Sequence, residues 1–553
     1  MDTQRLILVL IFSFSAFMLF EAWQRETRGP VAPTAETKEA KPATETTPQP
    51  SIKLEPPSAP GSAPSPPSAA GASETIRIHT DVLSLDVDLV GATLVRVELT
   101  RHRGTVDTTK NFVLLERSAQ HTYIAQSGLI GEGLPNHNSR FTAAAKEFRL
   151  ADGQERLEVP LEAQGADGVR LRKVLVLERS SYLVHVRQEL HNQGAGSVQA
   201  HGYYQLVRDG NPPEGDSKML PTYTGAAVYN QKDKYQKVSF DDIAKGKTPY
   251  SKSADDGWIG IVQHYFVAAW IAPEKVQREF YTKRLDRSDA ALYAAGLIVP
   301  FGKVEPGQTA TQSMSLYVGP QDQDKLPSIA EGLDLTVDYG WLTVIAVPLF
   351  WVLKTFYAWV GNWGVAIILL TVIIKILFYP LSAASYRSMA RMRVLAPKLQ
   401  RLKEQYGDDR QRMQQAMMEL YKTEKINPLG GCLPILVQIP VFIALYWVLL
   451  ASFELRQAPF MLWINDLAAA DPYYILPVLM GATMIIQTKL NPEPPDPVQA
   501  KLMKIMPIAF SIFFFFFPAG LVLYWLVNNV LSIAQQWQIT RSMERSAAAH
   551  VRR

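Results

Sequence analysis

Residues 365–379 read VAIILLTVIIKILFY, a run that is apolar except for Thr371 and Lys375. With its flanks, this run approaches the roughly 20 residues that a helix needs to cross a bilayer. A charge inside such a span costs on the order of 3 kcal/mol, so Lys375 requires water, a partner or a function. In the alternative interpretation, the long stem of Lys375 carries its ammonium to the headgroups near Pro380.

Further apolar runs follow this one and together predict a helical membrane core at residues 362–540. Prolines interrupt several of the runs, which membrane helices tolerate when neighbouring helices satisfy the backbone. The single cysteine, Cys432, opens one run, so no intramolecular disulfide can form. The predicted spans cover residues 362–381, 431–452, 472–489, 500–517 and 520–538.

The part of the chain before the membrane core contains three segments of different composition. Residues 1–26 hold a short apolar stretch without a small-residue cleavage site, which predicts an uncleaved signal anchor. Residues 27–73 are rich in proline, alanine and serine and predict a disordered periplasmic linker. Residues 74–335 contain many short runs in which apolar and polar residues alternate, as at 83–89 and 182–187. This period of two predicts a large periplasmic antiparallel β-sandwich.

The distribution of lysine and arginine predicts the topology, whereas the net charge of +4 is too small to indicate specific nucleic-acid binding. Residues 382–430 carry an excess of these cations and are therefore placed in the cytoplasm, as is the basic tail at 541–553. If residues 336–361 and the Lys375 run both crossed the membrane, the basic segment would lie outside. We therefore expect residues 336–361 to form an amphipathic helix in the outer interface, which leaves six spans with both termini cytoplasmic.

The basic segment 382–430 is predicted to form a helical hairpin, with a break at 407–409. One interpretation is a packed two-helix core with solvated charges. The other is an adaptable, methionine-rich surface for apolar peptide segments, with arginines that face ribosome or lipid phosphates. The residues that would form this surface are Arg387, Met389, Arg391, Met392, Arg393, Met413 and Met417.

Polar side chains recur within the predicted spans. No acid lies inside a predicted span to pair with Lys375, so water is its expected companion, in a hydrated cavity open to the cytoplasm. Alternatively, isolated amides of this kind form interhelical hydrogen bonds. His264 lies alone on a predicted strand and is expected to be a satisfied structural residue. The sequence contains no Walker A, HExxH, GxSxG or metal-spaced Cys/His motif, so we expect no enzyme activity, no cofactor and no metal. The polar span residues that would line this cavity are Lys375, Thr371, Gln438, Asn528 and Gln535.

The membrane half contains the motifs VDYGW at 337–341, VGNWG at 360–364, YPL at 379–381, NPLGGC at 427–432, ELRQAPF at 454–460, DPYYILP at 471–477 and PAGLVLY at 518–524. These motifs closely resemble the YidC/Oxa1/Alb3 membrane protein insertase family, in its Gram-negative YidC form. The resemblance implies an inner-membrane insertase and folding chaperone that works alone or with the Sec translocon (SecYEG, SecDF). Its implied partners are ribosomes, nascent membrane proteins and the lipid bilayer. The resemblance adds Tyr524 and Trp525 to the polar span residues, so the candidate groove residues are Lys375, Thr371, Gln438, Tyr524, Trp525, Asn528 and Gln535.

The resemblance also assigns roles to individual residues. Lys375 occupies the position of the family's positive groove residue, which is usually arginine, and Thr371 and Tyr524 match positions that face the client. Trp525 stands where the family often has a second tyrosine. The residues leave two other functions open. A transporter would use Lys375 to couple to an anion, but no internal repeat is evident. A sugar-processing or sugar-binding protein would use the β-sandwich.

Overall fold

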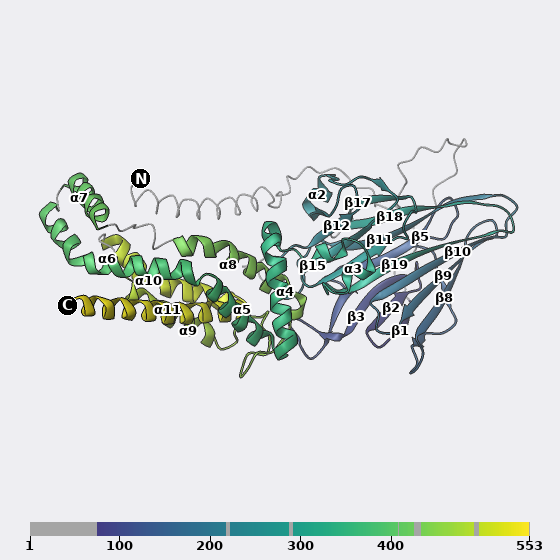
Figure 1. The fold of residues 1–553 in the computed structure, drawn as a ribbon. Coiled ribbons are helices and arrows are strands. Elements are labelled where there is room, and N and C mark those ends of the chain that lie inside the picture. The colour runs from purple at the N-terminus through teal and green to yellow at the C-terminus, as the bar shows by residue number, and fades with distance from the viewer. Residues whose placement is uncertain are drawn as a thin grey trace. The chain divides into compact units, whose positions relative to one another are not determined.

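The computed structural model describes residues 74–216, 222–286, 291–406, 409–424, 433–491 and 497–551. The predicted signal anchor, the linker and Cys432 lie outside these described residues. The chain divides into two compact units, which Figure 1 shows as a strand-rich part and a helical part. The strand-rich unit runs up to Gly319 and includes Ile329–Leu333, and the helical unit comprises Pro320–Ser328 and the chain from Asp334 onward.

The strand-rich unit is a β-sandwich of two sheets, which confirms the predicted fold class. One sheet has the strand order β14-β17-β18-β11-β5-β4-β3-β2-β1-β7, and the other has the order β13-β12-β15-β16-β19-β10-β9-β8-β6. Among the described pairings, β1–β7 alone is parallel. The strands are β1 Thr75–His79, β2 Leu83–Asp88, β3 Thr93–Arg103, β4 Asn111–Arg117, β5 Thr122–Ile130, β6 Thr142–Ala143, β7 Glu147–Arg149, β8 Arg156–Gln164, β9 Val169–Glu178, β10 Leu183–Asn192, β11 Val198–Asp209, β12 Gly225–Tyr229, β13 Gln236–Val238, β14 Ser253–Ala254, β15 Trp258–Gln263, β16 Phe266–Ile271, β17 Arg278–Asp286, β18 Ala291–Val304 and β19 Thr309–Pro320.

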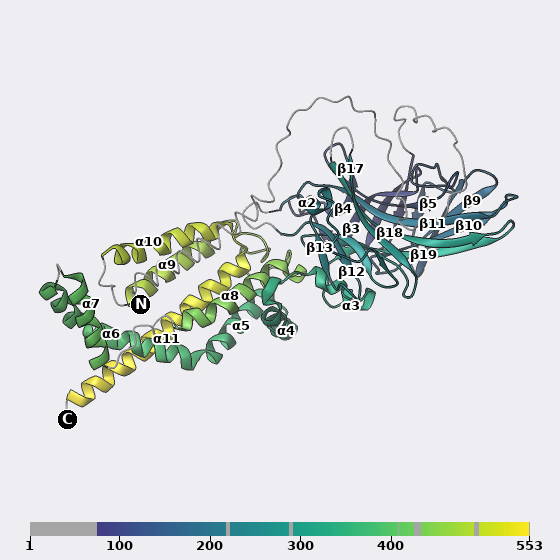
Figure 2. The same ribbon diagram turned by 90° about the horizontal axis from the view of Figure 1, so that it is seen from above.

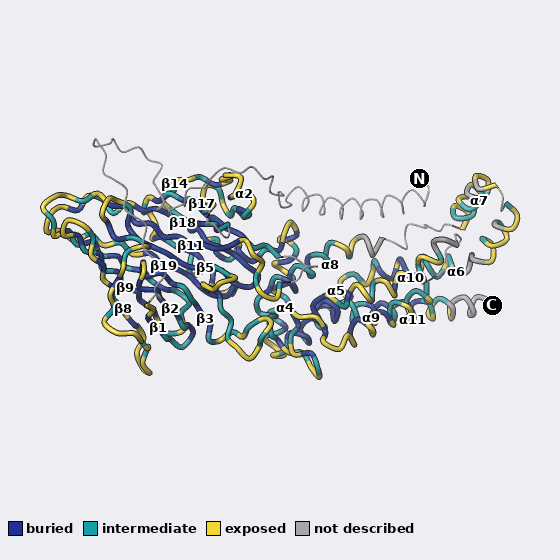
Figure 3. Tube along the Cα trace, turned by 180° about the vertical axis from the view of Figure 1, so that it is seen from behind, coloured by how far each residue is buried: buried dark blue, intermediate teal, exposed yellow. Residues whose placement is uncertain are grey.

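The alternation of side chains explains how these strands form a core. Along β10, every second residue from Val184 to Leu190 is buried while the residues that alternate with them are less covered, because successive side chains point to opposite faces of a sheet. The adjacent strands β15 and β16 are buried almost throughout, as expected of strands covered on both faces. Figure 3 shows burial along the strands and exposure at the loops.

Lys173 on β9 is a fully buried cation that links the two sheets. Its Nζ donates to the carbonyl oxygens of Gly91, at 2.8 Å, and of Ser127 on β5, at 3.0 Å. The ammonium also lies 4.8 Å from the ring centroid of Phe141. Burial lowers the pKa of Lys173 to about 7, because an apolar interior disfavours the charged form.

The helical unit contains long apolar helices and a basic helical hairpin. Figure 2 shows α9 and α10 as neighbours, and α9 also packs against α11. The elements of this unit are η2 Gly340–Leu342, α4 Thr343–Val360, α5 Trp363–Leu377, α6 Tyr379–Tyr406, α7 Arg410–Thr423, α8 Leu433–Ala451, η4 Phe453–Leu455, α9 Ile475–Leu490, α10 Pro497–Phe513, η5 Phe514–Phe516 and α11 Ala519–Val551. The short helices that remain are α2 Phe240–Ala244 in the strand-rich unit, and α3 Leu326–Ile329 and η1 Leu333–Thr336, which lie where the chain passes between the units.

Local signals define the ends of α4, α5 and α7. Gly361 ends α4 with a φ of 66°, a left-handed conformation that glycine adopts without strain. The next residue, Asn362, caps α5 by accepting from the backbone N–H of Val365 at 3.0 Å. Asp409 caps α7 in the same way, by accepting from the N–H groups of Gln411 and Arg412. The predicted break at 407–409 therefore includes Asp409, the residue that caps α7.

Length and composition single out few complete spans among the described helices. Gly340–Val360 is long and apolar enough to cross a membrane, and Trp363–Leu377 reaches that length only together with Tyr379–Met392, after a bend of 66°. The apolar parts of α8 and α9 are shorter than a span. Helix α11 continues to Val551, so it includes much of the predicted basic tail.

Candidate functional site

Lys375 lies in the last turn of α5, where its side chain points into the helical unit. It is 6% exposed, and its Nζ donates to Ser532 Oγ on α11 at 2.7 Å. The ammonium therefore does not extend to the end of the helix near Pro380. Its position near the C-terminus of α5 also suits a cation, because the carbonyl end of a helix carries partial negative charge.

Ser532 is the acceptor that holds this ammonium, and the sequence analysis did not identify it. Its own hydroxyl proton is donated to the backbone oxygen of Asn528, at 2.7 Å. The side chain of Tyr386, on α6, also lies next to Ser532. The one available signal was position: Ser532 lies one helical turn beyond Asn528, on the same face of α11.

Amide side chains extend the hydrogen-bonded network to α8. Gln438 Nε2 donates to Asn528 Oδ1 at 2.7 Å, and the side chain of Tyr524 lies next to Gln438. The structure thus brings together four of the predicted groove residues, on three helices. We define the polar cluster as Lys375, Tyr386, Gln438, Tyr524, Asn528 and Ser532.

Three predicted groove residues take no part in this network. Thr371 is buried, and its Oγ1 donates to the carbonyl of Ile367 in the preceding turn, at 2.7 Å. The Trp525 and Gln535 side chains each have a buried polar atom, Nε1 and Oε1, without a hydrogen-bond partner among the described residues.

The surroundings of Trp525 are aromatic rather than polar. Its ring centroid lies 4.6 Å from that of Phe442 and 5.4 Å from that of Phe514. Two further polar residues of α11 bind α9 instead of the cluster: Asn529 donates to Thr483 at 3.3 Å, and Gln536 donates to the Leu490 carbonyl at 3.1 Å. These two contacts have the form of interhelical hydrogen bonds.

Within the polar cluster, Lys375, Ser532 and Tyr524 are buried, whereas Tyr386, Gln438 and Asn528 are half-buried. Ser532 is 3% exposed and Tyr524 is 1% exposed. The cover comes from α6, which starts only two residues after α5 ends, packs against α11 and brings Tyr386 to the cluster. An ammonium has three N–H donors, and Ser532 is the single hydrogen-bond acceptor of Lys375 among the described residues. Two donors therefore remain for water or a ligand.

The hairpin of α6 and α7 combines partly buried methionines with exposed arginines. Arg387 and Arg391 are exposed, and the side chain of Arg393 lies outside the described residues. Lys398 and Glu424 connect the two arms through an ion pair of 2.6 Å. The methionines that are neither fully buried nor fully exposed are Met389, Met392, Met413 and Met417. The hairpin is therefore neither a closed apolar core nor a wholly apolar surface.

Comparisons with known proteins match both units. Residues 75–352 match the family described as YidC periplasmic domain, and residues 355–546 match the family described as 60Kd inner membrane protein. The chain is 56% identical to the membrane protein insertase YidC of Methylobacillus flagellatus, over 99% of each chain. It is 53% identical to the insertase of the same name from Dechloromonas aromatica, again over 99% of each. A solved structure of an active YidC insertase is 16% identical, with a TM-score of 0.38, and covers 84% of this chain and 92% of that chain.

Proposed function

This chain belongs to the YidC family of membrane protein insertases, and from that premise we propose that it inserts nascent transmembrane segments into the inner membrane and assists their folding. Family membership favours this function over the transporter and sugar-processing alternatives. The observation that carries the proposed mechanism is the buried ammonium of Lys375, which has two N–H donors without a partner among the residues that the structure describes.

The role of Lys375 follows from the energetics of the client. A short polar or acidic tail cannot cross dry hydrocarbon without large cost, because its polar groups lose water. A cation that already lies among the apolar helices gives a tail carboxylate a partner on the way, through charge-assisted hydrogen bonds. The client's own apolar helix drives the transfer, since Leu, Ile, Phe and Val each gain about 0.3–0.6 kcal/mol at the centre of a span. No nucleotide is needed for this step.

The buried part of the polar cluster, Lys375 and Ser532, must become accessible to admit a client. The element that would move is α6, because its Tyr386 side chain lies next to Ser532 and the bend of 66° after α5 separates it from the spanning helix. Displacement of α6 would break that contact and expose Lys375 to water from the cytoplasmic side. The proposed groove therefore becomes hydrated when α6 moves, and it is not a permanently open cavity.

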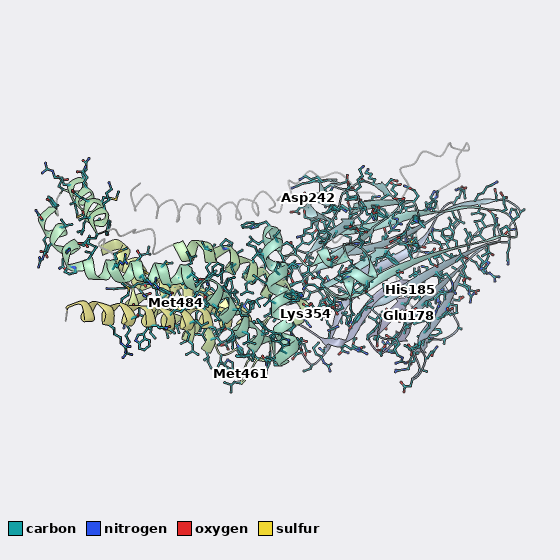
Figure 4. All side chains as sticks on the ribbon, in the orientation of Figure 1. Glu178, His185, Asp242, Lys354, Met461 and Met484 are labelled. Atoms are coloured by element: carbon teal, nitrogen blue, oxygen red, sulfur yellow. The ribbon has the colours of Figure 1, made fainter. Side chains whose placement is uncertain are left out.

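Two features of α4 support an interfacial position for this helix. Figure 1 shows α4 lying crosswise to α8 and α11 within the helical unit. Midway along α4, Lys354 forms an ion pair with Asp324, and Figure 4 marks its position. Such a charged pair is costly at the centre of a bilayer but is tolerated at its surface. We accordingly retain the topology of six spans, a periplasmic β-sandwich and cytoplasmic termini as part of the proposal.

The hairpin of α6 and α7 is proposed to receive clients from ribosomes. Its exposed arginines suit phosphate groups, and the flexible side chains of partly buried methionines such as Met413 and Met417 suit varied apolar segments. Cooperation with the Sec translocon is proposed from family membership alone.

Reconstituted insertion tests the proposed role of Lys375. Full-length protein in vesicles receives two clients that differ only in an acidic or a neutral tail. We expect Lys375→Glu to impair insertion of the acidic client and Lys375→Arg to preserve it, because arginine keeps the charge. Equal insertion of the acidic client by Lys375→Glu would refute the role. Deleting residues 75–319 in a parallel sample determines whether the β-sandwich is accessory.

A further inference from the structure

The loop between α8 and α9 presents two apolar side chains at its tip. Met461 is 51% exposed and Leu462 is 81% exposed. Figure 4 labels Met461 at the margin of the helical unit, pointing away from the helices. We call these two residues the loop tip. Exposed apolar residues are common singly, so the tip requires further observations before it indicates a binding surface.

Hydrogen bonds fix the loop tip relative to the helices. Phe460 N–H donates to the Ile464 carbonyl at 3.0 Å, and Ile464 N–H donates to the Met461 carbonyl at 3.2 Å, which closes a turn around the tip. Asn362, the cap of α5, donates to the Phe460 carbonyl at 2.8 Å. Leu467 further along the loop accepts from the first turn of α11. The tip is therefore a rigid projection rather than a free loop.

The backbone at the tip is unusual for its residue type. Leu462 has a φ of 56°, a left-handed conformation that glycine and asparagine adopt far more readily than a leucine does. A loop whose tip faced only water would favour one of those residues at this position. A bulky apolar residue in a strained conformation, with its side chain directed outward, indicates that the side chain meets something apolar.

The acidic groups of the loop point away from its tip. Asp471 is buried and accepts hydrogen bonds from the Trp463 indole and from the backbone of Tyr473 and Leu476. Asp466 accepts from backbone N–H groups within the loop. The tip thus has apolar side chains outside and the carboxylates inside, which is the arrangement expected at an apolar environment.

We propose that Met461 and Leu462 insert into the boundary between lipid headgroups and acyl chains. Two side chains are far too few for a stable protein interface, which needs ~1,000 Å² of buried surface, but they suit a lipid contact. The base of the tip is bonded to Asn362, two residues after α4 ends, so the tip lies beside the helix that we place in the membrane interface. Assigning the tip to the outer leaflet rests on the proposed topology, whereas the lipid contact does not rest on insertase activity.

Exposed aromatic and aliphatic side chains extend the apolar surface of the loop tip toward α4. Tyr473 and Tyr474, at the far end of the same loop, are 67% and 47% exposed, and tyrosine is enriched at membrane interfaces. The exposed residues of η2 and α4 are of the same kind, namely Trp341, Val344, Val347, Trp351 and Trp359. The tip and these residues would together form one lipid-facing surface at this level of the helical unit.

Depth-dependent fluorescence quenching tests the lipid contact. Leu462→Cys is introduced in a Cys432→Ser background, and the full-length protein is labelled with bimane and reconstituted into phosphatidylcholine vesicles. The control is Val106→Cys, an exposed apolar position in the strand-rich unit. We expect shallow nitroxide lipids to quench the label at 462 strongly and aqueous iodide to quench it weakly. The label at 106 should show the reverse.

A second variant separates lipid contact from folding. Leu462→Asn fits the positive φ and removes the apolar side chain, so a label on Met461→Cys in this variant should lose part of its quenching by lipid. Quenching of the 462 label by iodide to the extent seen at 106 would overturn the proposal. Lipid quenching of the Met461 label that is unchanged by Leu462→Asn would overturn the assigned role of Leu462. Because neither measurement uses a client, failure here is distinct from failure of the insertase mechanism.

Discussion

Replacing Ser532 with alanine should release the Lys375 ammonium and slow the insertion of clients with acidic tails. Ser532 Oγ accepts from Nζ at 2.7 Å, and both side chains are buried. A hydrogen bond to a charged group contributes about 1.5–3 kcal/mol, which is roughly a 10- to 100-fold change in the ratio of held to released amine. Once released, the long stem of Lys375 can carry the amine toward the membrane surface.

The assay compares initial insertion rates of full-length variants in vesicles, with paired clients whose tails carry Asp and Glu or Asn and Gln. We expect Ser532→Ala to slow the acidic client by about tenfold, from the lower end of the hydrogen-bond range, and to slow it more than the neutral client. Ser532→Thr keeps the hydroxyl and is the matched control. Tyr386→Phe keeps the acceptor Oγ and should have a smaller effect.

Two results would refute this reasoning. If Ser532→Ala inserts the acidic client at the normal rate, the hydrogen bond does not position the ammonium for its task. If the variant slows both clients equally while Ser532→Thr is normal, the hydroxyl supports packing of α5 against α11 and has no role specific to the tail.

Three further predictions concern stability, each measured by chemical unfolding of the full-length protein. Lys173→Met should remove a pH dependence from the unfolding free energy of the strand-rich unit. The pKa of Lys173 is about 7 in the folded protein and 10.5 as its ordinary value. Between these pH values the unfolded chain binds more protons than the folded one, so the stability of the wild type rises with pH across that window. That rise, up to about 1.4 kcal/mol per pH unit, should be absent from Lys173→Met, and an equal rise in both proteins would contradict the assignment. Gly364→Ala should destabilise the helical unit by about 1–3 kcal/mol through overpacking, because its Cβ would lie 2.0 Å from Phe460 Cδ2. Gly196→Ala, whose Cβ would meet no atom within 4 Å, is the control, and equal effects of the two changes would argue against the clash. Arg278→Lys should destabilise the strand-rich unit by about 3 kcal/mol, because the guanidinium donates to five backbone carbonyls that an ammonium cannot all reach. A loss of stability smaller than about 1 kcal/mol would show that the carbonyls find other donors.

The fold class was accessible from the sequence because a strand or helix imposes its period on the apolar residues. The alternation along β10 and the long apolar runs around Lys375 are visible without coordinates. The strand order was not accessible. β11 pairs with β5 and β18, which lie far from it and from each other in the chain, and such pairing depends on packing of the whole sandwich.

The candidate site was predicted in part, and the missing part has a physical cause. Lys375, Gln438 and Asn528 were identifiable because polar groups in apolar spans are costly and therefore conspicuous. Ser532 was not, because serine is common in helices and commonly bonds its own backbone, as it does here with Asn528. Its contact with Lys375 depends on how α11 is rotated against α5. The closure by α6 likewise depends on the bend after α5.

The most direct test of the central claim is whether the Lys375 amine meets a client carboxylate during insertion. A client with one tail acid is arrested midway through wild-type protein in vesicles and treated with a carbodiimide, which joins an amine to a carboxylate only at contact. Mass spectrometry should find the tail acid joined to Lys375. A client that is inserted at the normal rate, with its acid joined only to other lysines or to none, would contradict the account.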